Sequence, residues 1–72
     1  MYECDEVIKQ LGRNIKAERI RKGLTQEKLA ELYGCDRDYI SKIECGKQNI
    51  SIKIITKITN ILGSSLNDIF KF

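Results

Sequence analysis

Apolar residues recur along this chain at intervals of three and four, which is the period of one face of an α-helix. The first apolar stripe consists of Val7, Ile8, Leu11, Ile15 and Ile20. It predicts a helix over residues 6–22. Acidic residues at its start and basic residues at its end suit the helix dipole.

Two shorter stripes follow. The first contains Leu29, Ala30, Leu32 and Tyr33, and it predicts a helix over residues 26–33. The second contains Ile40 and Ile43, and it predicts a helix over residues 37–45. Because only residues 34–36 separate the two helices, we expect them to cross at a large angle.

The stretch from Ile50 to Ile61 carries two conflicting signals. Eight of its twelve residues are β-branched, which favours a strand. Its apolar positions nevertheless recur at three and four, and no other segment could pair with a lone strand. We therefore predict a fourth helix that starts after Ser51.

Four glycines divide these stretches: Gly23, Gly34, Gly46 and Gly63. Glycine closes helices because it adopts positive φ without a Cβ clash. Each is followed within about five residues by a side chain that caps helix starts; these are Thr25, Asp36, Ser51 and Ser65. Ser65 and Asp68 also fit a capping box, which predicts a fifth helix over residues 66–70. The expected fold is all-α, with one domain over residues 1–72.

The composition is that of a folded globular chain, with 42% apolar and 32% charged residues and a net charge of +3. No apolar run approaches the roughly 20 residues that a membrane span needs. The first six residues lack the basic and apolar blocks of a signal peptide. We expect a cytoplasmic protein with no membrane partner.

Residues for catalysis or metal binding are scarce. The chain has no histidine, and Cys4, Cys35 and Cys45 show no CxxC spacing. One chain therefore cannot supply the four ligands of a structural zinc site, and we expect reduced structural or surface thiols. There is no glycine-rich phosphate loop and no set of carboxylates at metal spacing. We expect no enzyme, no cofactor, no metal and no small-molecule effector.

The most informative segment is residues 26–45, QEKLAELYGCDRDYISKIEC. Small Ala30 suits a close crossing of two helices, and Gly34 suits the turn between them. Leu29, Cys35, Ile40 and Ile43 would form a buried wedge that fixes their angle. The outer face of the second helix then carries polar or long side chains: Arg37, Asp38, Tyr39, Ser41 and Lys42.

With these residues the chain resembles the Cro/CI or XRE-type helix-turn-helix family of phage repressors and bacterial regulators. The matching landmarks lie between Leu11 and Phe70 and include Gly23-Leu24-Thr25-Gln26, Leu29-Ala30, Gly34, Tyr39-Ile40-Ser41-Lys42-Ile43-Glu44 and Gly46-Lys47. The resemblance implies a compact, five-helix, lambda-repressor-like domain with its motif at about residues 25–45. It implies a homodimer that places one helix of each subunit in successive major grooves of a near-palindromic operator.

Two strings, residues 36–41 and 49–53, look similar to restriction–modification controller proteins. The same features are shared by phage-type repressors and antitoxins, which remain alternatives. A protein–protein module on the same fold is a further alternative. Such a module would carry exposed Leu, Met or Phe on the outer face of its second motif helix, where this chain carries polar residues.

The resemblance also suggests individual roles. Arg37 can bond guanine O6 and N7 together. Tyr39 would touch a base or sugar, or else pack against the preceding helix. Ser41 and Lys42 would reach bases or phosphates, and Asp38 would accept from cytosine N4 or favour the helix start.

Further residues would contact the phosphate backbone or hold the fold. Phosphate contacts are expected from Gln26, Lys47, Gln48 and Asn49. Arg19 and Glu44 resemble the family's buried ion pair, the alternative being a phosphate contact by Arg19.

The last twelve residues, 61–72, carry more apolar side chains than a small core needs at its edge. We expect a dimer interface there, formed by Ile61, Leu66, Ile69, Phe70 and Phe72. The alternative is that these side chains close the core of the single chain.

Overall fold

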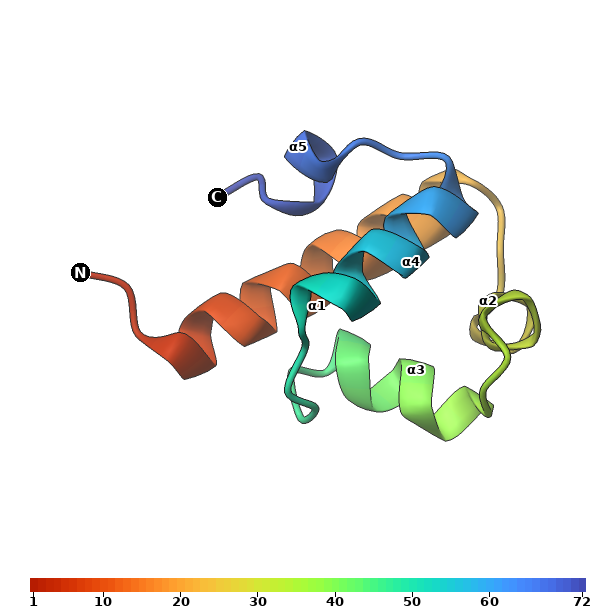
Figure 1. Cartoon of the computed structure of the whole chain (residues 1–72), viewed down its shortest axis with the longest axis horizontal. Coiled ribbons are helices and arrows are strands. Elements are labelled where there is room, and N and C mark those ends of the chain that lie inside the picture. The colour runs from red at the N-terminus through yellow and green to blue at the C-terminus, as the bar shows by residue number, and fades with distance from the viewer.

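The computed structural model describes all 72 residues and contains five helices and no strand. They are α1 (Cys4–Arg21), α2 (Gln26–Tyr33), α3 (Arg37–Glu44), α4 (Ile52–Leu62) and α5 (Leu66–Ile69) (Figure 1). The predicted all-α fold is confirmed. In α4 the helical period prevails over the β-branched composition, because Ile55, Ile58 and Leu62 are buried on one face.

The helix boundaries differ slightly from the prediction. α1 begins two residues earlier, at Cys4, and ends one residue earlier, at Arg21. α3 and α5 each end one residue before their predicted ends. The next residues, Cys45 and Phe70, act as C-caps.

The predicted capping residues start four helices. Thr25, Asp36, Ser51 and Ser65 each accept a hydrogen bond from the backbone N–H three residues later, at 3.0, 2.9, 3.2 and 3.2 Å. Ser65 and Asp68 complete a capping box. These bonds satisfy N–H groups that have no partner within the helix.

The turn between α2 and α3 depends on Gly34, which has φ of +92°. A residue with a Cβ is strained in this left-handed conformation. The N–H groups of Gly34 and Cys35 both donate to the carbonyl of Ala30, at 2.8 and 3.0 Å. Figure 1 shows α2 nearly end-on and α3 across the page, so the two helices cross at the large angle expected.

The core contains one or more residues from every helix: Leu11, Ile15, Leu29, Ala30, Ile40, Ile43, Ile55, Ile58, Leu62 and Ile69. Two residues of the apolar stripes lie outside the core, because Ile20 and Leu32 are 58% and 49% exposed. At the end of α1, Glu18 and Arg19 occupy the inward positions instead of Ile20.

Candidate nucleic-acid interface

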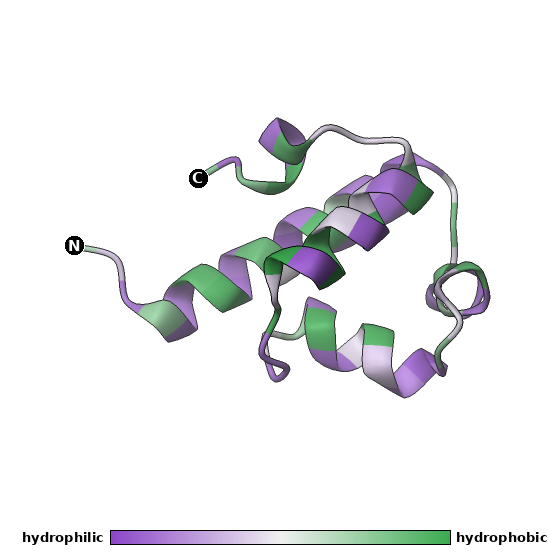
Figure 2. Ribbon diagram, in the orientation of Figure 1, coloured by the Kyte–Doolittle hydropathy of each residue, from purple (hydrophilic) through white to green (hydrophobic).

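α3 is held rigidly against the rest of the protein. Ile40 and Ile43 are buried in the core, and Glu44 also points inward. Gly12 of α1 lies directly against the end of α3, since a Cβ there would overlap the carbonyl oxygens of Ile43 and Glu44. The backbones of α1 and α3 therefore touch, and this contact fixes the direction of α3. Figure 2 shows the hydrophobic segments of α3 on the side turned toward α1 and α4.

The outer side of α3 carries the residues that the sequence assigned to base edges. Arg37, Asp38 and Lys42 are exposed, and Ser41 is half-buried. Asp38 lies in the first turn of α3 and forms no ion pair with Arg37. This face therefore offers both donors and acceptors on one exposed helix.

Tyr39 lies on the flank of α3 that faces α2. Its ring centroid is 5.8 Å from that of Tyr33, and Nζ of Lys57 lies 4.2 Å from the Tyr33 centroid. Burial raises the pKa of the Tyr33 phenol. The packing contact, one of the two roles expected for Tyr39, is present in the structure.

A buried ion pair links α1 to α3. Arg19 donates from Nε to Oε2 of Glu44 at 2.7 Å and from Nη2 to Oε1 at 3.1 Å. Its Nη1 donates to the carbonyl of Leu24 at 2.8 Å. The side chains of Arg19 and Glu44 are only 9% and 2% exposed. The guanidinium of Arg19 therefore binds Glu44 and the Leu24 carbonyl in the turn before α2.

Gln26 belongs to the same network, because its Nε2 donates to Oε1 of Glu44 at 3.0 Å. Lys16, Arg19, Gln26 and Arg37 line one shallow depression at the start of α2. Sequence reasoning missed Lys16, although it lies one helical turn before Arg19. The depression, which Glu27 also lines, brings Lys16 and Arg37 to the place where a phosphate contact by Gln26 was expected.

The remaining predicted phosphate contacts lie in the loop after α3. Lys47 and Asn49 are exposed, and Gln48 is half-buried. The loop and the start of α2 thus flank the two ends of α3.

A comparison with known protein families identifies the family to which this chain belongs. Residues 15–69 match the helix-turn-helix family. The chain belongs to the XRE-type helix-turn-helix family.

Relatives of this helix-turn-helix protein include a prophage-derived HTH-type transcriptional regulator, YonR, of Bacillus subtilis. The two are 37% identical over 83% of this chain, which spans 56% of YonR. The control protein C.BamHI of Bacillus amyloliquefaciens is 41% identical over 85% of this chain and 76% of its own length.

Among solved structures, the restriction–modification controller protein C.AhdI from Aeromonas hydrophila has a TM-score of 0.87. It is 32% identical, and the match covers 96% of this chain and all of C.AhdI. The resemblance to controller proteins therefore extends over nearly the whole of this helix-turn-helix chain.

The five residues expected at a dimer interface differ in their exposure. Four of them form what we call the C-terminal surface: Ile61, Leu66, Phe70 and Phe72. Leu66, Phe70 and Phe72 are 48%, 40% and 54% exposed, and Ile61 is half-buried. Ile69 is completely buried, so its predicted place at the interface is wrong. Its side chain closes the core of the single chain.

Asn14 holds the segment that carries these apolar residues. Its Nδ2 donates to the carbonyls of Ile69 and Lys71 at 2.7 and 2.8 Å, while Gln10 donates to its Oδ1 at 3.0 Å. The ring of Phe72 also meets that of Tyr2 edge-on, with centroids 6.0 Å apart. Nothing in the periodicity of the sequence marked Asn14.

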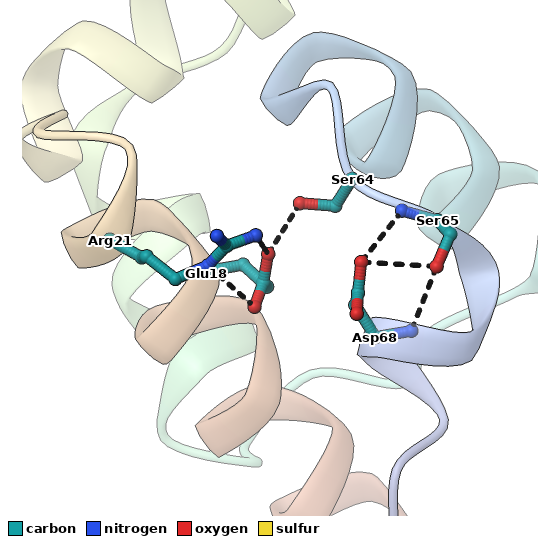
Figure 3. A network of polar contacts seen from close by, with 5 residues as sticks. All are labelled: Glu18, Arg21, Ser64, Ser65 and Asp68. Carbon is teal, nitrogen blue, oxygen red and sulfur yellow. Dashed lines mark hydrogen bonds and ion pairs between the residues drawn. The ribbon is translucent and has the colours of Figure 1, made fainter.

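Figure 3 shows a second polar network, which joins the end of α1 to the turn between α4 and α5. Glu18 accepts from Arg21 at 2.8 Å and from the Ser64 hydroxyl at 2.6 Å. These bonds hold the pKa of Glu18 below its ordinary value. The bonds from the backbone N–H and hydroxyl of Ser65 lower the pKa of Asp68 in the same way.

The structure contains no group of three or more cysteine or acidic side chains placed to hold a metal ion. Cys4 and Cys45 are exposed and Cys35 is half-buried, all three as free thiols. Burial raises the pKa of the Cys35 thiol. None of the helices is long and apolar enough to cross a membrane.

Proposed function

We propose that this protein is a sequence-specific regulator of transcription that binds double-stranded DNA as a homodimer on a near-palindromic operator. The observation that carries the proposal is the outer face of α3. It is polar and exposed at Arg37, Asp38 and Lys42, while its inner face is locked into the core. A major groove admits one such helix and displays a distinct pattern of donors and acceptors for each base pair.

Phosphate contacts would set the position of α3. The depression at the start of α2 offers Gln26, and the loop after α3 offers Lys47, Gln48 and Asn49. Contacts of this kind fix register and supply affinity without reading sequence.

The dimer would form through the exposed apolar side chains Leu66, Phe70 and Phe72, with the half-buried Ile61 beside them. Two subunits would then present two copies of α3, which matches a near-palindromic site. We place the protein in the cytoplasm, with DNA as its partner and with no catalytic activity or cofactor.

A narrower proposal is that the protein controls a restriction–modification system. It is supported by the match to C.AhdI, which covers all of that controller, whereas the match to YonR covers only part of that regulator. A phage-type repressor or an antitoxin is the alternative. A selected operator that lies upstream of an endonuclease or methyltransferase gene would favour the controller.

Selection of binding sites from a random duplex library tests the main proposal. We expect an enriched, near-palindromic sequence with half-sites about one helical turn apart. Arg37→Ala should lose preference at one base pair of each half-site. A library that shows no enrichment would contradict sequence-specific binding.

A further inference from the structure

Three basic residues of α1, among them Lys16 of the depression at the start of α2, form none of the hydrogen bonds or ion pairs described above. Lys9, Arg13 and Lys16 are spaced by four and three residues, so they lie on one helix face. All three are exposed, and none forms an ion pair, since the ion pairs of the structure involve other residues. Asp5 and Glu6 lie one turn before Lys9, and Glu27 lines the same depression as Lys16.

Cations at such spacings repel one another and slightly destabilise the helix. A polyanion would relieve this repulsion.

Two of the three cations lie close to α3, and Arg13 lies between them on α1, where it lines a depression with Lys9 and Phe72. Lys9 lies against the residue that follows α3, because a Cβ on Gly46 would come within 2.9 Å of the Lys9 Cα. At the other end, Lys16 lines the same depression as Arg37, the first residue of α3. Gly12, between them, touches the α3 backbone. Lys9 and Gly12 therefore lie at the C-terminal end of α3, and Lys16, about 10 Å from Lys9 along α1, lies beside the first residue of α3.

We propose that Lys9, Arg13 and Lys16 form a line of phosphate contacts on the DNA strand that borders the groove beside α3. This inference rests on the proposed function, because it requires α3 to enter a major groove. The stripe would bind the sugar–phosphate backbone and contribute equally to all sequences.

The test compares two variants of equal charge. Lys9→Gln/Arg13→Gln removes two charges of the stripe. Lys22→Gln/Lys71→Gln also removes two charges, from the turn after α1 and from the C-terminal segment. The C-terminal segment lies on the opposite side of α1 from α3, and the turn after α1 lies at the other end of that helix from Lys9 (Figure 1). Both variants and the wild type are titrated with a mixed-sequence 30-base-pair duplex between 50 and 200 mM salt, after sedimentation has shown equal mass.

Each phosphate contact contributes about 0.9 to the slope of log affinity against log salt. We expect Lys9→Gln/Arg13→Gln to lower this slope by about 1.8 per bound subunit. Lys22→Gln/Lys71→Gln should leave the slope near that of the wild type. Lys9→Arg/Arg13→Lys, which keeps both charges, should also keep the slope.

Equal slopes for the two charge-removal variants would overturn this inference and leave the regulator proposal standing. Absence of salt-dependent binding by the wild type would instead overturn the regulator proposal. If Lys9→Gln/Arg13→Gln does not fold, Arg13→Gln alone carries the test, with an expected loss of about 0.9 in slope.

Discussion

The outer face of α3 and the C-terminal surface both expose side chains that a single chain does not need for its core, but they differ in chemistry. The α3 face exposes charged groups on a helix that is fixed by buried isoleucines and by the backbone of α1. The C-terminal surface exposes leucine and phenylalanine on a four-residue helix and its tail, which Asn14 holds by two hydrogen bonds.

This difference supports a separate proposed partner for each surface. Charged donors on a rigid helix suit the grooved, anionic surface of DNA. Exposed apolar side chains gain free energy only when another apolar surface covers them. Under the proposed function, one chain carries a DNA-binding surface and a subunit-binding surface. A change of residues in the DNA-binding surface should then leave subunit association intact.

The largest expected effect is the loss of the support beneath α3. Glu44→Ala would leave Arg19 buried without its partner, at a cost of about 3–5 kcal/mol in the free energy of unfolding. Urea unfolding measures this loss. The exposed pair Lys28–Glu31, with 3.4 Å between Nζ and Oε1, provides the control. Glu31→Ala should cost under about 1 kcal/mol, and equal losses in the two variants would contradict the structural role of the buried pair.

Arg37→Ala should weaken specific DNA binding by about 1–3 kcal/mol and leave subunit association unchanged. The reason is loss of a bidentate contact to a base, which Arg37→Lys, keeping the charge, should not restore. Competition titration with matched and mismatched operators measures the effect. An unchanged operator preference would remove Arg37 from the base-reading residues.

Phe70→Glu should weaken subunit association about tenfold, because it buries a carboxylate at an apolar interface. Analytical ultracentrifugation over a concentration series measures the dissociation constant. Leu32→Glu is the control, since Leu32 is also about half exposed, at 49%, but lies on α2. If both variants associate like the wild type, the C-terminal surface is not the interface.

A smaller effect is expected on acidification. The folded-state pKa values of Glu18 and Asp68 lie below their ordinary values. Both groups therefore contribute stability above the unfolded-state pKa values near 4, and this stability is lost as pH falls through the folded-state values. Thermal unfolding between pH 6 and 2.5 measures the loss. Glu18→Gln should flatten the profile, and a variant with the wild-type profile would show that the Glu18 network adds no stability.

Much of the fold could be predicted from local sequence alone. Thr25, Asp36, Ser51 and Ser65 mark helix starts because capping depends on residues only three positions apart. The isoleucine spacing of three and four predicted α4, because helical periodicity is also a local property of the sequence. Burial of individual side chains is harder to predict from local sequence. Ile20 continues an apolar stripe, but it lies beyond the edge of the core and is exposed.

Only some residues of the candidate site could be predicted from the sequence. Arg37 and Lys42 follow from the periodicity of α3, because outward positions are determined by inward ones. Asn14 and Lys16 could not be found in this way. Their roles come from segments far apart in the chain, such as the 55 positions between Asn14 and Ile69.

A titration of the labelled protein with its selected operator, followed by backbone amide NMR, tests the central claim most directly. We expect the largest changes in amide chemical shift at residues 37–42, with further changes at Gln26 and at residues 47–49. Changes confined to α4 and α5, with α3 unaffected, would contradict it.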